Sequence, residues 1–322
     1  MPRLSLLVPF VRDPQALEAT LLNVLEMRSS ETELLIVHRG QYEDPYGLDG
    51  DEAIVIETSV NATLAEQLNV AARRATGEIV QVLLPGTLLQ SEWADGALEA
   101  FEESDVDVVS LGITSQGSFQ SGGVGGGDQQ TVFGYDAQVL PQRRMTSDPV
   151  SIAGPLLAGT MIRRATLLGI GGWNEKIASD LIDFELCLMT QVLNLNIGVV
   201  ADVQLACQEP TAHALSPYES GKAIGMLAIA YSLVEGSKLT VEPLGRRLGA
   251  LATGLMNPKL AAERLGWVLG VRDRSLVRPI AERVELARAR LSGSVLQTPA
   301  TGRSHVPAHV PGNLPDASQR AA

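Results

Sequence analysis

The sequence is poor in aromatic residues and in positive charge. Only 4% of its 322 residues are aromatic, and 25 lysines and arginines stand against 37 aspartates and glutamates, giving a formal net charge of -12. Aromatic side chains are the platforms on which proteins stack single-stranded bases, and an acidic chain repels phosphate backbones. We therefore predict no nucleic-acid partner.

Cysteines and long apolar runs are also scarce. The two cysteines, Cys187 and Cys207, lie in neither a CxxC nor a Cys/His spacing, which argues against zinc and against a disulfide framework. The apolar run Ala223–Val234 is too short to cross a bilayer, which takes about 20 residues. The start of the chain, Met1–Pro9, lacks a small-residue cleavage site, so we interpret it as a strand and not as a signal peptide. We predict a cytoplasmic protein with no transmembrane segment.

Apolar runs and amphipathic helical segments alternate along the first part of the chain. The composition is 45% hydrophobic, enough for a substantial core. Predicted helices follow Asp13-Pro14 and cover Thr63–Ala75 and about Ser91–Phe101. The predicted strands are Leu4–Phe10, Glu33–His38, Ala53–Glu57, Glu78–Leu84 and Val106–Ile113. This alternation indicates an α/β fold with a doubly wound, mostly parallel sheet.

The pattern changes in the second part. Gly117–Asp128 is glycine-rich but has no Gly-x-Gly-x-x-Gly between a strand and a helix, so we predict a mobile loop and not a phosphate cradle. A further helix is predicted at Asp183–Asn194 and one or two strands at Asn196–Cys207. Only helical signals follow, and the last residues have the composition of a disordered tail. We predict an α/β domain over residues 1–215, a helical region over 216–291 and a disordered tail over 292–322.

The order of these elements and five short stretches resemble the family 2 glycosyltransferases, which have the A-type nucleotide-sugar-binding fold. The likeness covers roughly Leu4–His213. The stretches are a first strand ending in Val8-Pro9, a second ending in Val37 with Gly40 after it, Asn61 eight residues before Asn69, Ala75–Leu84, and Gly169–Glu175 leading into Asp183–Leu186. The resemblance implies an A-type glycosyltransferase-like sheet with a helical C-terminal extension.

The resemblance also implies a reaction, which is inverting transfer of a sugar from a nucleotide diphosphate donor to an acceptor hydroxyl. In the family a carboxylate takes the hydroxyl proton, and a divalent cation neutralises the leaving diphosphate. Acidic residues serve at three places. The usual acidic pair after the second strand is His38 and Arg39 here, and the usual Glu-Asp pair before the later helix is Ile182-Asp183, followed by Glu185. Met189 stands where an arginine is common.

At the third place, the family's Asp-x-Asp motif, this sequence has Leu84, Pro85 and Gly86. Hard divalent cations need oxygen ligands, and neither Leu84 nor Gly86 has a side-chain oxygen. Thr87 offers one hydroxyl in place of two carboxylates. Proline followed by glycine is typical of a type II turn, which is our prediction for this stretch. We predict no metal ligands and no cofactor.

Asp183 is the candidate catalytic base, with an N-cap as the alternative role. Asp180 is the candidate if the helix register differs by one turn. The resemblance gives these candidate substrate-binding residues: Pro9, His38, Arg39, Thr87, Trp173 and Glu185.

Several of these candidates have a structural alternative. The alternative for His38 and Arg39 is an exposed strand end, the alternative for Trp173 is a buried anchor, and the alternative for Glu185 is a solvated charge. Two basic pairs, Arg143-Arg144 and Arg163-Arg164, are candidates to replace the metal. Surface charge is the alternative for both pairs. For Asn61 and Asn69 we predict structural roles.

Two hypotheses for function follow. The first is a metal-independent glycosyltransferase whose partner is a nucleotide-sugar donor. The second is a catalytically inactive transferase fold that serves as a binding or scaffold partner of another protein. The amphipathic C-terminal helices are suited to covering the chain's own core, to a protein partner or to peripheral contact with a membrane surface.

Overall fold

A computed structural model describes residues 2–10, 13–103, 105–115, 118–121, 124–125, 131–132, 152–207, 215–241 and 258–297. The Arg143-Arg144 pair and the predicted tail beyond residue 297 lie outside the described residues.

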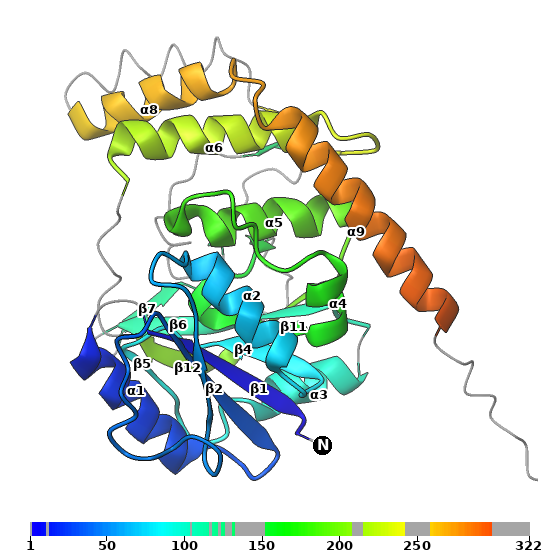
Figure 1. Cartoon of the computed structure of the whole chain (residues 1–322). Coiled ribbons are helices and arrows are strands. Elements are labelled where there is room, and N and C mark those ends of the chain that lie inside the picture. The colour runs from blue at the N-terminus through cyan, green and yellow to red at the C-terminus, as the bar shows by residue number, and fades with distance from the viewer. Residues whose placement is uncertain are drawn as a thin grey trace, which may run out of the picture.

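The centre of the fold is a sheet to which nine strands of the described residues contribute, in the order β3-β2-β1-β4-β11-β6-β12-β5, with β7 paired to β6 (Figure 1). β1, β2, β3 and β4 are parallel, β11 is antiparallel to its neighbours β4 and β6, and β12 is parallel to β6. The strands are β1 (Leu4–Pro9), β2 (Thr32–His38), β3 (Ile54–Glu57), β4 (Ile79–Val82), β5 (Thr87–Leu88), β6 (Val108–Ser115), β7 (Ser118–Ser121), β11 (Thr160–Arg163) and β12 (Ile197–Cys207). The predicted α/β class and mostly parallel sheet are confirmed.

Helices cover both faces of this sheet. One face carries α1 (Pro14–Met27) and α3 (Asp95–Glu103), and the other carries α2 (Leu64–Arg74), α4 (Arg164–Gly169) and α5 (Ile182–Leu193). Neighbouring residues of one strand face the two cores, so Leu6 packs with α1 whereas Leu7 packs with α2. Because both faces are covered, every residue of β1 is buried, as are the apolar residues Leu34–Val37 of β2.

Local signals set several helix boundaries. Asp13 caps α1 by accepting hydrogen bonds from the N–H groups of Gln15 and Ala16, and Pro14 occupies the first helical position. Thr63 and Glu66 form a reciprocal capping box at α2. Both helices begin where these residues predict.

The glycine-rich stretch Gly117–Asp128 is not entirely the loop that we predicted. Within it, β7 pairs antiparallel with β6, and β8 (Val124–Gly125) pairs with β10 (Ile152–Gly154). Strand pairing satisfies backbone hydrogen bonds whatever the side chains are, so the hydrophobic periodicity of this segment gave no signal. Another short pair joins β9 (Thr131–Val132) to β13 (Thr240–Val241).

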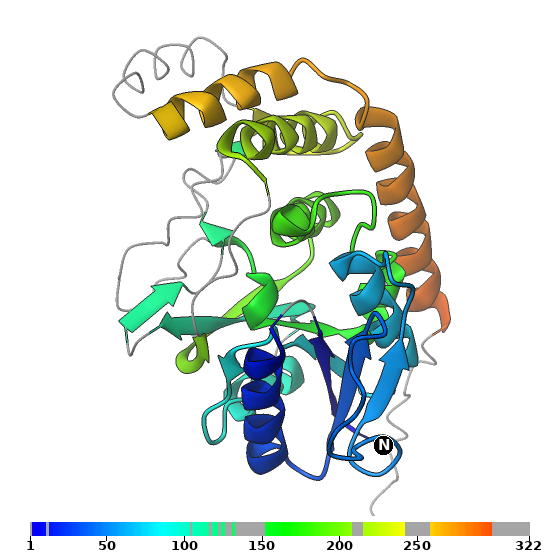
Figure 2. The same cartoon turned by 60° about the vertical axis from the view of Figure 1, so that its left-hand side comes forward.

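The C-terminal helices share a core with the sheet. α6 (Pro217–Ser232), α8 (Pro258–Gly270) and α9 (Val277–Gln297) place apolar residues in the same cluster as α2, α5 and Trp173. α5 lies between the sheet and the α6–α8 pair, and α9 passes along one side toward α4 (Figures 1 and 2). α9 ends at Gln297, so the helical region continues past the end that we predicted at Leu291. No helix among the described residues is long and apolar enough to span a membrane.

Glycines allow α6 and α8 to approach closely. A methyl group added at Gly221 of α6 would lie 2.0 Å from the backbone oxygen of Glu263, and one at Gly266 of α8 would lie 2.1 Å from the backbone oxygen of Tyr218. Gly225 and Gly270, one turn further along each helix, meet the facing backbone in the same way. The backbones of the two helices are therefore in direct contact, as small residues permit.

Candidate functional site

The carboxyl ends of the parallel strands bring together residues that are far apart in sequence. β1 ends at Pro9 and β2 at His38, and the turn after β4 follows Val82. Pro9 pairs with Val37 across the strands, and the Phe10 N–H donates to the Val37 carbonyl at 2.7 Å. This edge of an open α/β sheet is where ligands commonly bind.

The turn at Leu84–Thr87 has the predicted geometry. The Thr87 N–H donates to the Leu84 carbonyl at 2.9 Å, and Gly86 has a φ of 89°. Proline at the second position and a left-handed glycine at the third define the type II turn. This prediction is confirmed.

The same turn is bound to α1. The Gly86 N–H donates to the Ala16 carbonyl at 3.1 Å and to Thr20 Oγ1 at 2.9 Å, and Thr20 Oγ1 donates to the Thr87 carbonyl at 3.0 Å. Two residues on, Asn23 exchanges hydrogen bonds with both backbone groups of Leu89. The segment after β4 is therefore fixed to the neighbouring helix through its backbone.

These residues do not fit a divalent metal. Leu84, Pro85 and Gly86 contribute no side-chain oxygen, and Thr87 is fully buried. In the part of the chain that the structure describes, no group of three or more histidine, cysteine, aspartate or glutamate side chains could hold a metal ion.

His38 is buried, with 5% of its surface exposed, so the solvent-facing alternative is wrong. Its Nδ1 accepts hydrogen bonds from the N–H groups of Gly40 at 3.1 Å and Tyr42 at 3.4 Å. The ring thereby holds the loop after β2 through its backbone. Burial, together with the nearby Asp44, raises the pKa of Tyr42 to about 12. Arg39 is half-buried, and its backbone N–H donates a hydrogen bond to Gln41 Oε1 at 2.7 Å.

Asp183 lies in the first turn of α5 and is half-buried. It is not the N-cap, because a 3-10 turn at Ser179–Leu181 runs directly into the helix and Leu181 occupies the cap position. Asp183 Oδ1 accepts a hydrogen bond from the Phe184 N–H at 2.8 Å, and Asp180 Oδ2 accepts one from the Leu215 N–H at 3.0 Å. α5 ends just before β12 begins, so its first turn lies toward the carboxyl edge of the sheet (Figure 1).

Glu185 is also placed differently from the sequence prediction. We expected a solvated charge as the alternative to substrate binding, but only 1% of the residue is exposed. Its Oε1 accepts hydrogen bonds from the Tyr231 hydroxyl and from Asn174 Nδ2, the latter at 3.2 Å, and lies 3.4 Å from Arg283 Nε. The carboxylate thus joins α5 to α6, to α9 and to the turn after α4.

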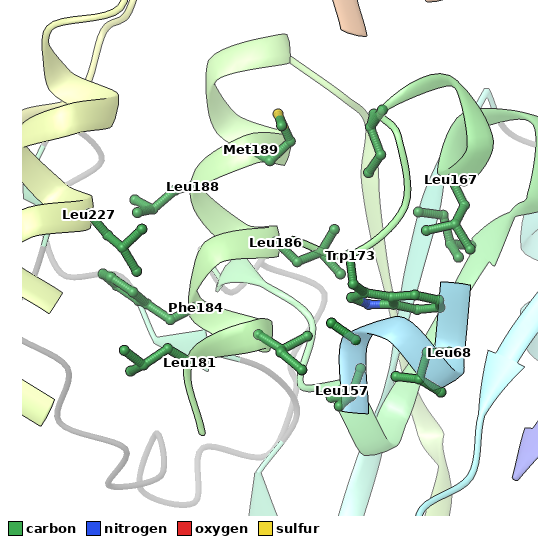
Figure 3. Packing of buried hydrophobic residues seen from close by; sticks show 14 of the residues in the cluster. Leu68, Leu157, Leu167, Trp173, Leu181, Phe184, Leu186, Leu188, Met189 and Leu227 are labelled. Carbon is green, nitrogen blue, oxygen red and sulfur yellow. The ribbon is translucent and has the colours of Figure 1, made fainter. Parts of the chain in front are cut away.

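Trp173 is a buried anchor, the second of the two roles that we considered. It is 2% exposed and lies among Leu68, Leu157 and Leu186 (Figure 3). The side chain of Asn69 holds its backbone, with Nδ2 donating to the Trp173 carbonyl and Oδ1 accepting from the Trp173 N–H, both at 2.8 Å. The structural role predicted for Asn69 is therefore confirmed.

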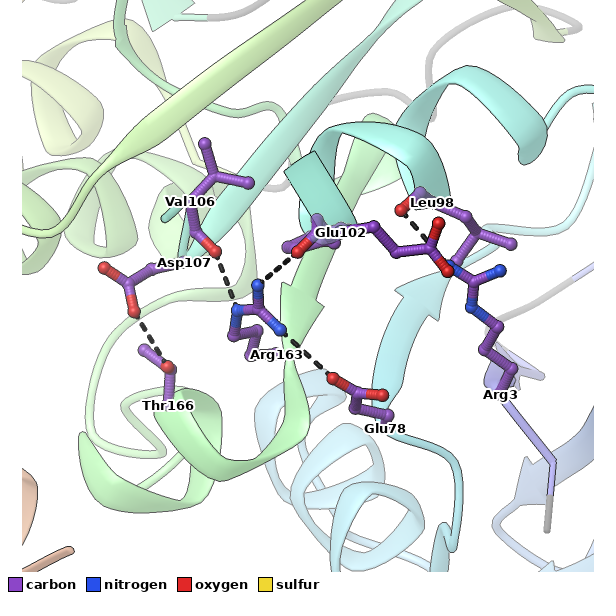
Figure 4. A network of polar contacts seen from close by, with 9 residues as sticks. Arg3, Glu78, Leu98, Glu102, Val106, Asp107, Arg163 and Thr166 are labelled. Atoms are coloured by element: carbon purple, nitrogen blue, oxygen red, sulfur yellow. Dashed lines mark hydrogen bonds and ion pairs between the residues drawn. The ribbon is translucent and has the colours of Figure 1, made fainter. Parts of the chain in front are cut away.

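Arg163 and Arg164 lie at the opposite edge of the sheet from the turn. β11 runs antiparallel to β4, which pairs Arg163 with Ile79 at the start of β4. The Arg163 guanidinium donates to the carbonyls of Phe101 and Val106 at 2.6 and 2.8 Å and binds Glu78 at 3.1 Å (Figure 4). Arg164 Nε donates to the Ala72 carbonyl at 3.3 Å. These two arginines join elements of the fold and do not face the carboxyl edge.

Sequence reasoning missed Tyr231, Arg283 and Asn174, the partners of Glu185. Tyr231 is 46 residues from Glu185 and comes from a segment with only helical signals. No spacing in the sequence relates a tyrosine and an arginine on separate helices to a carboxylate on a third. Only the tertiary packing does so.

The strand order, the antiparallel β11 within an otherwise mostly parallel sheet, and the position of α5 define an A-type glycosyltransferase-like fold. Solved structures share it. S. aureus TarS 1-349 in complex with UDP-GlcNAc has a TM-score of 0.57 at 18% identity, covering 91% of this chain and 92% of that one. A mannosyltransferase from Pyrobaculum calidifontis in complex with GDP-Man and Mn2+ has a TM-score of 0.53 at 15% identity, covering 92% and 88%. No family model and no curated protein matches the sequence.

Proposed function

We propose that this chain is a glycosyltransferase family 2-like protein that transfers a sugar, with inversion, from a nucleotide-sugar donor to an acceptor hydroxyl without a metal held at the Leu84–Thr87 turn. The observation that carries the proposal is the Asp183 carboxylate in the first turn of α5, toward the edge where β1 and β2 end. The fold neighbours support it, because they are complexes with UDP-GlcNAc and with GDP-Man.

In this mechanism Asp183 is the general base. Its carboxylate takes the proton of the acceptor hydroxyl while that oxygen attacks the anomeric carbon and the bond to the diphosphate breaks. Pro9, His38 and Arg39, at the ends of β1 and β2, are assigned to the donor. With Arg163 and Arg164 at the far edge, Arg39 is the basic residue that we assign to the diphosphate, because arginine forms strong charge-assisted hydrogen bonds with phosphate oxygens.

A second candidate function is a catalytically inactive fold that binds a partner protein. The observation that favours it is that several predicted substrate-binding side chains are buried and contact only other parts of the fold among the described residues. Thr87 and Trp173 are buried, and the Glu185 carboxylate is bound by α6 and α9. A protein that no longer handles a donor would keep such groups for stability alone.

Calorimetric titration of the chain with UDP-GlcNAc and GDP-Man, each with and without Mn2+, separates the two functions. The transferase proposal expects binding of at least one donor, with an affinity that Mn2+ changes by less than about threefold, or about 0.7 kcal/mol. Absence of binding to both, and to the corresponding free diphosphates, would leave the binding-protein function.

The base is tested by replacing Asp183 with asparagine. We expect nucleoside diphosphate release to fall by about 10²- to 10⁴-fold with donor affinity nearly unchanged, as for loss of a general base. Asp105→Asn is the matched control, because Asp105 is exposed and, among the described residues, its contact is a hydrogen bond from Asn196 to its backbone carbonyl. Asp180→Asn tests the alternative base, and a loss confined to that variant would reassign the role.

A further inference from the structure

The buried carboxylate of Glu185 is the point at which the C-terminal helices reach the candidate site. Its partners come from three separate elements: Tyr231 of α6, Arg283 of α9 and Asn174 of the turn after α4. Glu185 is 1% exposed and Tyr231 is fully buried. Tyr231 and Asn174 donate hydrogen bonds to the Glu185 carboxylate, and the Arg283 guanidinium supplies the opposite charge, with Nε 3.4 Å from Oε1.

The charges in this cluster are matched. A buried carboxylate is costly unless it is paired and hydrogen-bonded, and removal of one partner leaves an uncompensated group. Burial and the neighbouring Glu185 raise the pKa of Tyr231 well above its usual range. The tyrosine therefore stays protonated and keeps donating to the carboxylate. The cluster is a permanent link between the helices and not a titrating switch.

Arg283 makes a second contact that extends the link. Its Nη2 donates to the Gly172 carbonyl at 2.6 Å while its Nε faces Glu185. Gly172 belongs to the turn whose Trp173 is held by Asn69 of α2. One arginine of α9 thus contacts both the turn and α5.

Glu185 and Asp183 lie two residues apart in the first turn of α5. Within one turn of helix the backbone is rigid, so holding Glu185 in place also fixes the direction in which the Cα–Cβ bond of Asp183 leaves the helix. We propose that Glu185 is a positioning residue through which α6 and α9 set the orientation of the Asp183 carboxylate. This inference rests on the proposed function, in which Asp183 is the base.

The test compares two tyrosine variants of the full chain. Tyr231→Phe removes the hydroxyl that donates to Glu185 and keeps the buried ring, so the fold should survive. Tyr218→Phe is the matched control, because it is the same change on the same helix at a residue that is 36% exposed. Glu185→Gln is the conservative third variant, since it keeps an acceptor for Tyr231 but loses the charge that faces Arg283.

Hydrogen exchange of amides in α5 is the first measurement. In Tyr231→Phe we expect the amides of Leu186–Met189 to exchange about tenfold faster while those of β1 and α1 change little, because local opening is separable from global unfolding. Tyr218→Phe should match the wild type, and Glu185→Gln should lie between. Unchanged exchange in α5, or an equal increase in β1, would overturn the proposal.

Turnover is the second measurement. We expect kcat to fall about tenfold in Tyr231→Phe with the donor KM within about twofold, since a misplaced base affects the chemical step and not donor binding. Faster exchange in α5 with unchanged kcat would also overturn the positioning role. Failure of the proposed function would instead appear as absent donor binding in the wild-type chain. The exchange measurement would still decide whether α6 and α9 hold α5.

Discussion

The side chain of Asn69 on α2 forms two hydrogen bonds with the backbone of Trp173, which is 104 residues away in the chain. Its Nδ2 also donates to Glu175 Oε1 at 2.8 Å. A methyl group added at Gly172, whose φ is 73°, would lie 2.1 Å from Asn69 Oδ1. The turn Gly171–Trp173 and this asparagine are therefore complementary in shape and hydrogen bonding. The same turn also accepts a hydrogen bond from Arg283 at the Gly172 carbonyl.

Replacement of Asn69 with alanine should destabilise the fold. The change removes the side-chain donor and acceptor that bind the buried backbone C=O and N–H of Trp173. We therefore expect a loss of about 2–4 kcal/mol in the free energy of unfolding. Asn61→Ala is the control. We predicted a structural role for Asn61 from the sequence, but the residue is exposed, so its replacement should change stability by less than about 0.5 kcal/mol. Urea denaturation followed by circular dichroism measures both. Equal losses in the two variants would contradict the structural role of Asn69.

The sequence predicted best where a local rule decides the conformation. Asp13-Pro14 begins α1, Pro85-Gly86 forms a type II turn, and the apolar runs become strands covered on both faces. It predicted least where a side chain's partner comes from a distant element. Glu185 has the pattern of a solvated helix charge until α6 and α9 cover it, and Arg163 is placed at the far edge by the antiparallel direction of β11.

Thr20→Val tests the attachment of the Leu84–Thr87 turn to α1. The change preserves shape but removes the hydroxyl that accepts from Gly86 and donates to the Thr87 carbonyl. We expect a loss of about 1–3 kcal/mol in the free energy of unfolding. Thr190→Val is the matched control: Thr190 is as buried, but the hydrogen bond of its hydroxyl goes to the Cys187 carbonyl of its own helix. A loss no greater than that of Thr190→Val would mean that the attachment contributes little.

Stability should depend on the charge of Glu33. Desolvation by burial opposes ionisation of this carboxylate, but hydrogen bonds from Ser5, Thr76 and Gly77 outweigh it and lower the pKa below 4.5. A lowered folded-state pKa stabilises the fold above the unfolded-state value, and this stabilisation is lost as the pH falls through the folded-state value.

The measurement is the difference in unfolding free energy between the wild type and Glu33→Gln as a function of pH. We expect a constant difference near neutral pH that shrinks below pH 4.5. Glu31→Gln, at an exposed neighbour, is the control for the loss of one negative charge. A difference that stays constant through the acidic range would show that the hydrogen bonds do not depend on ionisation of Glu33.

The glycines between α6 and α8 give the sharpest test of the C-terminal region. Alanine is normally the better helix former by about 0.5–1 kcal/mol. At Gly221, however, its methyl group would lie 2.0 Å from the Glu263 carbonyl oxygen, and a backbone atom cannot move aside as a flexible side chain can. We therefore expect Gly221→Ala to destabilise the chain by about 1–3 kcal/mol through overpacking.

Gly293→Ala on α9 is the matched control, because nothing lies within 4 Å of the added methyl group. This variant should gain about 0.5–1 kcal/mol from helix propensity alone. Thermal unfolding of both variants measures the sign of each effect. A gain in both would mean that α6 and α8 do not pack backbone to backbone. A loss at Gly221 that spreads to α5 in hydrogen exchange would show that the helices and the sheet unfold as one unit, as their shared core predicts.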